Sequence, residues 1–223
     1  ALLGVFALAA WAVAARHGTR KRASTAIPPP ANRTLRSLLH SRLAWLVTIY
    51  FGLQSLFAYV MMGWMPQVFV DAGVSRGTAG VLLAITSVLG VPCSLVVTPI
   101  AARQRSQSGW AAGLTLIGGL GVIGLLVAPA AAPWLWSVLI GVGMGAFTVA
   151  IALISLRTRD PADTRQLSTM TQGIGYLLAA VGPLVFGLLR GITGSWTMSL
   201  TLLLAAVCLQ VVIGILAGRP RYI

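Results

Sequence analysis

Residues 134–156 read WLWSVLIGVGMGAFTVAIALISL, an apolar run of helical length without a single charged residue. The stretch RTRDPADTR follows directly at residues 157–165 and brings charge back into the chain. A helix needs about 20 apolar residues to cross the hydrocarbon core of a bilayer, so this run is long enough to span a membrane. The alternation of charge-free runs and charged gaps recurs along the chain and predicts its fold class.

Five further runs share this length and composition. They lie at about residues 43–65, 79–101, 110–128, 168–190 and 196–217. Backbone groups in lipid must pair within their own segment, so each span is expected to be a helix. Hydrophobic residues make up 57% of the 223 and charged residues 9%, against about a quarter charged in soluble domains. These features predict an all-α integral membrane protein with a six-helix bundle over residues 43–217.

The cationic side chains are divided unequally between the two predicted sides of the membrane. All of them fall in gaps on one side except Arg76 and Arg190. Because basic loops stay in the cytoplasm, the loop 16–42 and the tail 218–223 are predicted to be cytoplasmic, in a multi-pass protein of the cell (inner) membrane. The net charge of +13 follows from this bias. We therefore expect the lipid bilayer as a partner and no nucleic acid.

A shorter apolar run occupies residues 1–15, before the basic loop. Fifteen helical residues extend about 22 Å, which is less than the roughly 30 Å of a hydrocarbon core. We therefore interpret this run as the end of a helix that begins upstream. Within 16–42, leucines at helical spacing from Leu35 onward predict a short amphipathic helix at the membrane surface.

No Asp, Glu, Lys, Arg or His lies in the middle of any of the six long spans. Proton pumps and voltage sensors normally carry such groups within the membrane. A retinal protein needs a lysine there, whereas the sole lysine, Lys21, lies in a gap. Cys93 and Cys208 do not have metal-ligand spacing, and a zinc enzyme would need a cluster of ligands. We accordingly expect neither an enzyme nor a bound metal or cofactor.

Neutral polar and aromatic side chains inside the spans supply the candidate site. Tyr50 and Gln54 share one face of the first span, and Gln172 and Tyr176 share one face of the fifth. Because an unpartnered glutamine is costly in lipid, both amides are expected to face protein or a water-filled cavity. Interhelical hydrogen bonding and a solute cavity both fit this pattern. The candidate solute-binding residues are Tyr50, Gln54, Tyr59, Phe147, Gln172 and Tyr176.

Glycines and prolines interrupt several of the spans. Glycine lets helix backbones approach closely, and proline bends a helix. Tight packing and bending of helices as a pathway opens are compatible interpretations of these positions. The candidate packing or gating residues are Gly90, Pro92, Gly141, Gly145, Gly182 and Pro183.

The order of partial helix, long basic loop and six spans resembles the second half of a twelve-helix major facilitator transporter. The segments TQGIGYLLAAVGPLVFGLL (171–189), GSW (194–196) and GLQSLFAYVMMGWMPQVFVDAGVS (52–75) are similar to the cyanate permease and nitroimidazole transporter family. The resemblance implies that residues 1–15 end helix 6 and that the six spans are helices 7–12. It also implies the N-terminal half of the same transporter as a partner.

The same resemblance implies secondary active transport of small polar or weakly anionic organic solutes by alternating access. The stretch PIAARQRSQSG (99–109) departs from the family's acidic-basic motif, since it keeps Arg103 and Arg105 but has no Asp. A charge-paired cytoplasmic latch is therefore not expected from this half, and any proton-coupling carboxylate is expected in the N-terminal half. A seven-helix receptor or sensor is the alternative that the number of runs leaves open.

Overall fold

The computed structural model describes residues 35–223, so the predictions for 1–15 and for most of 16–42 lie outside the described residues. Every regular element of the described part is a helix. The helices are α2 (Leu35–Leu38), α3 (Arg42–Asp71), α4 (Arg76–Arg103), α5 (Ser108–Val127), α6 (Pro133–Met144), α7 (Ala146–Leu156), α8 (Pro161–Thr193) and α9 (Thr197–Ala217). Counting α6 and α7 together, six helices are long and apolar enough to cross a membrane. The predicted all-α membrane fold is confirmed.

Local sequence signals define where these helices begin and end. The Ser41 hydroxyl accepts a hydrogen bond from the Ala44 N–H at the start of α3, and the Ser75 hydroxyl caps α4 in the same way. Helix α8 begins with Pro161, whose missing N–H costs nothing in a first turn. It ends at Gly194, where φ is +67°, a left-handed conformation that glycine adopts without strain.

The run at 134–156 forms two helices that meet at Gly145. The Gly145 N–H donates to the Val142 carbonyl at 2.9 Å, and the Thr148 N–H donates to the Gly145 carbonyl at 3.1 Å. Both bonds have the three-residue spacing of a 3₁₀ turn, so the α-helical ladder is interrupted here. The interruption lies near the middle of the membrane-length unit, a level at which irregular backbone needs protein or water around it.

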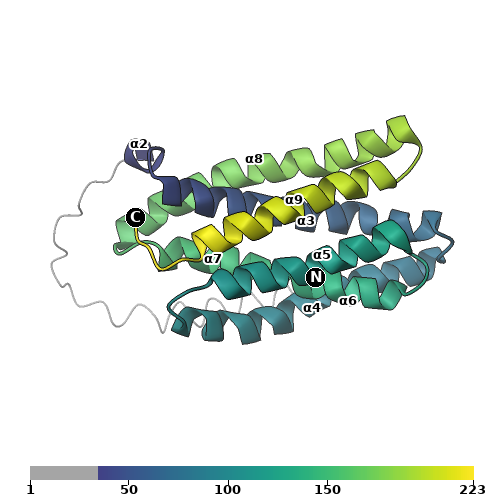
Figure 1. Cartoon of the computed structure of the whole chain (residues 1–223), viewed down its shortest axis with the longest axis horizontal. Helices are drawn as coiled ribbons and strands as arrows, with labels where there is room; N and C mark the ends of the chain where they lie inside the picture. The colour runs from purple at the N-terminus through teal and green to yellow at the C-terminus, as the bar shows by residue number, and fades with distance from the viewer. Residues whose placement is uncertain (1–34) are drawn as a thin grey trace, which may run out of the picture. The chain divides into compact units, whose positions relative to one another are not determined.

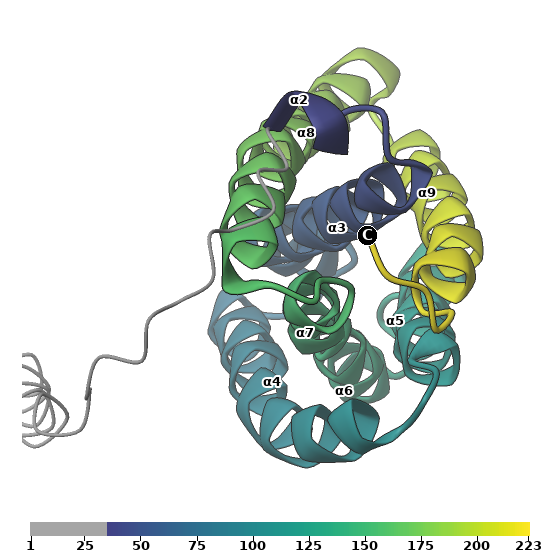
Figure 2. The same cartoon turned by 90° about the vertical axis from the view of Figure 1, so that its left-hand side faces the viewer.

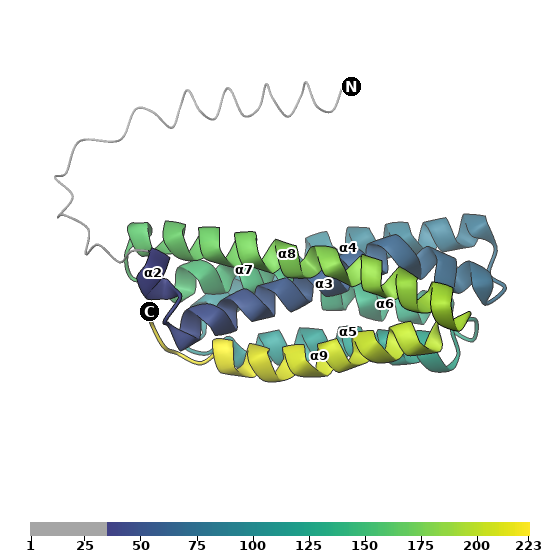
Figure 3. The same cartoon turned by 90° about the horizontal axis from the view of Figure 1, so that it is seen from above.

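The described helices are arranged in three layers along one long axis (Figure 1). Viewed from the end, α8 and α4 lie on one side, α5 and α9 lie on the opposite side, and α3 and the α6–α7 pair lie between them (Figure 2). The view from above shows the same order (Figure 3). The most apolar stretch of α3 is 67% buried, whereas the corresponding figures for α4 and α8 are 17% and 22%. The α4 and α8 side of the bundle is therefore largely uncovered.

Arg157 ties together three segments at the end of α7. It is 3% exposed, and its guanidinium donates to the carbonyl groups of Ala217 at 3.0 Å and Gly218 at 2.9 Å. It also donates to the side-chain oxygen of Gln107, between α4 and α5. The two carbonyls end α9, where a cation is favoured by the helix dipole. We call Arg157, Gln107 and these carbonyls the arginine cluster.

The C-terminal tail is attached to the same place. The Ile223 N–H donates to the Arg157 carbonyl at 2.9 Å, and the Arg159 guanidinium lies 5.1 Å from the centre of the Tyr222 ring. Burial lowers the pKa of Arg157 from its ordinary value, whereas the neighbouring Tyr222 raises it. An arginine nevertheless stays charged in a protein. The cluster is thus a buried cation surrounded by neutral acceptors.

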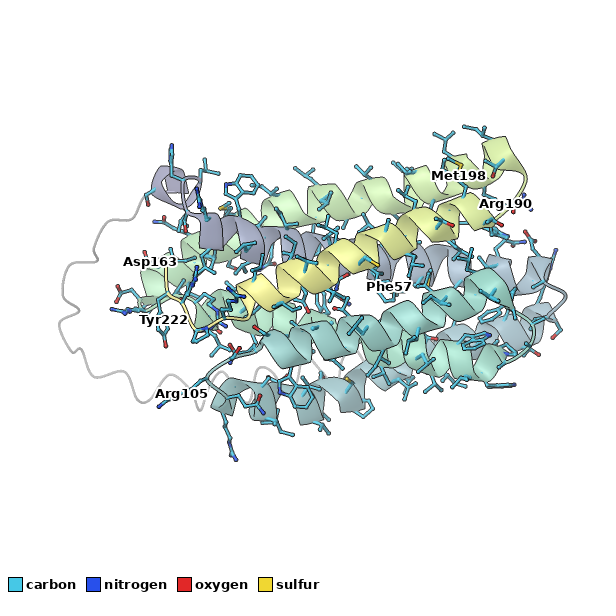
Figure 4. All side chains as sticks on the ribbon, viewed as in Figure 1. Phe57, Arg105, Asp163, Arg190, Met198 and Tyr222 are labelled. Carbon is cyan, nitrogen blue, oxygen red and sulfur yellow. The ribbon has the colours of Figure 1, made fainter. Side chains whose placement is uncertain are left out.

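Asp71 organises the opposite end of the bundle. Its carboxylate accepts hydrogen bonds from the Gln67 amide at 2.6 Å, the Trp196 indole at 2.9 Å and the Arg190 guanidinium at 3.1 Å. Arg190 also lies 5.1 Å from the centre of the Trp196 ring. We call these four residues the aspartate cluster; it joins α3, α8 and the start of α9. Arg190 and Tyr222 mark the two opposite ends in Figure 4.

Candidate solute-binding face

Four aromatic rings from α3, α7 and α8 form one continuous group. Phe51 lies with its ring centre 5.5 Å from that of Phe147 and 5.2 Å from that of Tyr176, against which it packs edge to face. Tyr176 is stacked with Tyr59, with ring centres 6.3 Å apart and planes within 11° of parallel. Phe51 is fully buried, whereas 43% of Tyr59 and 37% of Tyr176 are exposed. We call this group the aromatic face.

A close approach of two helix backbones positions this face. A Cβ added at Gly52 would lie 3.2 Å from the Gly175 Cα, and one added at Gly175 would lie 2.6 Å from the Phe51 ring. The two glycines therefore let α3 and α8 touch, which brings Phe51 under Tyr176. Tyr59 and Tyr176 each lie near the middle of a membrane-length helix, and Phe147 directly follows the α6–α7 interruption.

Gln172 lies on the exposed side of α8, one turn before Tyr176. Its amide nitrogen donates to the Ser168 hydroxyl at 2.6 Å. The structure thus places Gln172, Tyr176, Tyr59 and Phe147 on or beside the aromatic face. These four sequence-predicted residues combine ring surfaces with one exposed amide.

Gln54 lies elsewhere, in a buried polar network inside the bundle. Its amide nitrogen donates to the carbonyls of Gly143 at 3.4 Å and Met144 at 3.5 Å, beside the interruption between α6 and α7. Its side-chain oxygen accepts from the Gln210 amide, which also donates to the Thr115 hydroxyl at 3.1 Å. Gln54 is 1% exposed, and these contacts are interhelical hydrogen bonds. The network satisfies polar groups that would otherwise be costly at this depth.

Tyr50 is also fully buried, away from the four exposed or partly exposed candidates. Its hydroxyl donates to the Ala111 carbonyl at 3.4 Å, and its ring packs where a Cβ at Gly214 would lie only 2.7 Å away. Gly214 therefore makes room for the tyrosine between α3 and α9. Tyr50 packs the α3, α5 and α9 helices together, behind the aromatic face.

Sequence reasoning missed Gln210 and Thr115, the partners of Gln54. A signal was available, because Gln210 is the one amide side chain in the 196–217 run and needs a buried partner as Gln54 does. It also missed Gly52 and Gly175, which lie in apolar stretches without any unusual spacing. The two glycines matter because α3 and α8 pack against each other at these positions, and the sequence alone does not show which helices pack together.

The packing and gating candidates have different surroundings. A Cβ at Gly141 would lie 2.9 Å from the Thr86 carbonyl, one at Gly145 would overlap the Cys93 sulfur, and one at Gly182 would lie 2.6 Å from Leu56. All three are close-packing positions. Around Gly90 there is open space, so it makes no such contact with the described helices.

The two prolines also have different surroundings. Pro92 is exposed on α4. The Pro183 carbonyl accepts a hydrogen bond from the Trp64 indole at 3.0 Å, which joins α8 to α3.

Residues 35–223 contain no group of three His, Cys, Asp or Glu side chains placed to hold a metal ion. The chemistry available at the aromatic face is therefore stacking, apolar contact and neutral hydrogen bonding.

Comparison with known proteins identifies the family. The sequence profile of the Major Facilitator Superfamily matches residues 1–183. An uncharacterized transporter of Bacillus subtilis, YycB, is 37% identical over 199 residues, which cover 86% of this chain and 50% of that protein. The 2-nitroimidazole transporter of Escherichia coli is 33% identical over 84% of this chain and 48% of its own length.

The cyanate transport protein CynX of Escherichia coli is 30% identical over 70% of this chain and 40% of its own length. The chain thus spans half or less of the length of these curated relatives. The match covers most of the chain and agrees with a bundle of six membrane-length helices. This chain belongs to the Major Facilitator Superfamily.

Proposed function

We propose that this chain is the C-terminal half of a secondary active transporter that moves small polar or weakly anionic organic solutes by alternating access. The observation that carries the proposal is the aromatic face, which is partly exposed at mid-length of helices that are otherwise apolar. Major facilitator transporters bind solutes near the bilayer midplane between two halves. Half-exposed tyrosines and an amide at that level fit the wall of such a pathway.

The uncovered side of the bundle supports a second half as the partner. Helices α4 and α8 form one outer layer and are the least buried of the six spans. Large apolar residues are exposed there, among them Val88 at 66%, Leu95 at 71% and Leu177 at 72%. In the proposed protein the N-terminal half covers part of this side, and the solute pathway runs along the rest. Four spans face that pathway: α3, α4, the α6–α7 pair and α8.

The distribution of charge supports an orientation for the proposed transporter. The basic loop 16–42 and the tail 218–223 are placed in the cytoplasm, and the aspartate cluster lies at the outer end. The protein resides in the cell (inner) membrane. Because the described spans have no Asp, Glu, His, Lys or Arg at mid-depth, any proton-coupling carboxylate belongs to the N-terminal half. Membership of a transporter family does not favour the receptor alternative.

Within this proposal we assign different roles to the candidate residues. Gln172, Tyr176, Tyr59 and Phe147 are assigned to solute contact, because they lie on or beside the partly exposed face. Tyr50 and Gln54 are assigned to support, since they are buried and hydrogen-bonded within the bundle. Gly141, Gly145 and Gly182 serve close packing, and Gly90, Pro92 and Pro183 are the positions left for helix bending.

Transport by the intact protein in liposomes tests the proposal, with the relatives' solutes, 2-nitroimidazole and cyanate, as probes. Gln172→Ala removes one hydrogen-bonding amide, worth about 1 kcal/mol, and should slow uptake about fivefold at low solute concentration. Gln67→Ala is the matched control, the same truncation at an exposed position in the aspartate cluster. Equal transport by the two variants at equal membrane abundance would contradict the assigned site, and transport of neither probe by the wild type would count against the proposed function.

A further inference from the structure

We infer that the turn between α4 and α5 binds one anionic phospholipid, with its phosphate at Arg103 and Arg105 and one acyl chain in a groove along α5. Helix α5 lies in the layer opposite to α8, so the groove is separate from the aromatic face (Figure 2). The inference goes beyond the proposed function, because the ligand is a membrane lipid rather than the transported solute.

A groove with a volume of about 370 Å³ opens where α4 turns into α5. Its lining residues are Gln104, Gly109, Trp110, Gly113, Leu114 and Ile117. Those on α5 recur every three or four residues, so they form one face of that helix. From Gly109 to Ile117 the helix rises about 12 Å, less than the hydrocarbon of one leaflet, which is half of a core of roughly 30 Å. The groove therefore has a length that suits one acyl chain within one leaflet.

Two glycines keep this groove open. A Cβ added at Gly109 or at Gly113 would have no neighbouring heavy atom within 4 Å. Farther along the same helix, a Cβ added at Gly118 would lie 3.1 Å from the Phe57 ring, because α3 fills that space. Gly109 and Gly113 thus do not serve contact between the described helices, and the space beside them is available to a lipid chain.

The mouth of the groove is positively charged. Arg103 and Arg105 are both exposed and flank Gln104 in the chain, and Arg105 extends away from the helices at this end (Figure 4). Within residues 35–223 neither guanidinium forms an ion pair, and the stretch 99–109 contains no Asp or Glu. Arginine near a membrane surface attracts anionic lipids, and its planar group matches the geometry of a phosphate. The two arginines are therefore available to a lipid headgroup.

Trp110 indicates the level of the groove in the membrane. Its indole nitrogen donates to the Gln104 side-chain oxygen at 3.1 Å, so both side chains lie at the mouth. Because indole rings prefer the headgroup level, the mouth lies among the headgroups, and Leu114 and Ile117 lie in hydrocarbon. An anionic head joined to an apolar chain fits both parts of the site. A free phosphate ester would leave the groove empty, and a lipid without net charge would leave the arginines unpaired.

Lipid titrations of the purified intact protein in a neutral detergent test the inference, with affinity measured from the rise in melting temperature. Phosphatidylglycerol should bind at least about tenfold more tightly than phosphatidylcholine with the same acyl chains. About 1 M salt should remove most of this preference. Glycerol 3-phosphate, which carries the charge without the chains, should not displace phosphatidylglycerol at equal concentration. Equal binding of the two lipids, or displacement by glycerol 3-phosphate, would overturn the inference.

Matched variants locate the site. Arg103→Gln combined with Arg105→Gln should weaken phosphatidylglycerol binding about thirtyfold, whereas Arg165→Gln, the same change at another exposed arginine on this end of the bundle, should leave it unchanged. Gly113→Leu places a side chain in the groove and should weaken binding about fivefold. Its control is Gly80→Leu, at an exposed glycine of α4 that is equally free of neighbours.

Unchanged binding in the double arginine variant or in Gly113→Leu would contradict the site, and so would an equal loss in either control. None of these measurements involves transport, so their outcome is independent of the proposed function.

Discussion

The arginine cluster and the aspartate cluster hold opposite ends of the same bundle by opposite means. Arg157 is 3% exposed and has only neutral oxygen acceptors. The Arg190–Asp71 pair is a formal salt bridge at 3.1 Å, but its side chains are 32% and 29% exposed. Each cluster joins one end of α9 to other helices. The arginine cluster therefore has no ion pair but is shielded from water, whereas the aspartate cluster has an ion pair that water reaches.

Burial, rather than the presence of opposite charges, therefore decides which end is the stronger connection. An exposed ion pair contributes little because water and salt screen it. A buried carbonyl that loses its donor costs the full desolvation of that group, about 1–3 kcal/mol. The absence of an acidic residue in the stretch 99–109 thus does not leave this end open. Gln107, from that same stretch, connects it to Arg157 instead.

The largest expected effect is that of Arg157→Met. The Gly218 carbonyl would keep its bonds from the Gln107 N–H at 2.9 Å and the Ser106 hydroxyl at 3.0 Å. Methionine fills similar space but leaves the Ala217 carbonyl and the side-chain oxygen of Gln107 without a donor, which should lower the free energy of unfolding by about 3 kcal/mol or more. Thermal unfolding of the intact protein in detergent measures this. Arg159→Met is the matched control, because Arg159 is exposed and only stacks on Tyr222, a contact worth about 0.5–1 kcal/mol. If the two variants lost the same unfolding free energy, a buried arginine would not stabilise the protein more than an exposed one, and the prediction would be wrong.

A smaller loss is expected from Gln107→Ala. The Gln107 amide donates to the carbonyls of Ala101 at 3.0 Å and Gln104 at 2.7 Å, while its oxygen accepts from Arg157. Removing it should cost about 1–3 kcal/mol of unfolding free energy, because the buried Ala101 carbonyl and the buried Arg157 guanidinium each lose a partner. The double variant with Arg157→Met should lose less than the sum of the two single losses, since both remove one shared bond. Strict additivity would show that the two side chains do not act together.

The existence of the six membrane helices could be predicted from sequence because lipid leaves the backbone no alternative to the helix. The sequence does not predict in the same way which helices pack against each other, or through which faces. In water an apolar stripe marks the buried face of a helix, but in a membrane the lipid-facing side is equally apolar. The buried position of Tyr50 and the partly exposed position of Tyr59, on the same helix, are therefore not distinguished by hydropathy.

The polar candidates illustrate the same limit. That Gln54 and Gln172 need partners or water follows from the cost of an unpaired amide. Which alternative applies depends on packing: Gln54 meets Gln210 and the carbonyls at the α6–α7 interruption, whereas Gln172 stays on the exposed side of α8. Arg157 was interpreted only as one of many cytoplasmic charges, although it directly follows an apolar run of 23 residues. Its burial results from the way α7 and α9 end side by side.

The smallest expected effect, and the one that completes the comparison, is that of Asp71→Asn. Asparagine keeps the shape but removes the charge and one of the two acceptor oxygens. Its remaining oxygen can still accept from Trp196 and Arg190, while the exposed Gln67 amide must turn over and accept from the asparagine NH2 through its own oxygen. The loss of unfolding free energy should be about 0.2–1 kcal/mol. It should shrink further at about 1 M salt, where the screening length falls to about 3 Å. Thermal unfolding of wild type and variant at low and high salt measures both effects.

Arg157→Met should show no comparable salt dependence, because its lost partners are neutral and buried. A salt-independent loss above about 2 kcal/mol for Asp71→Asn would mean that the exposed cluster holds its end as strongly as the buried one.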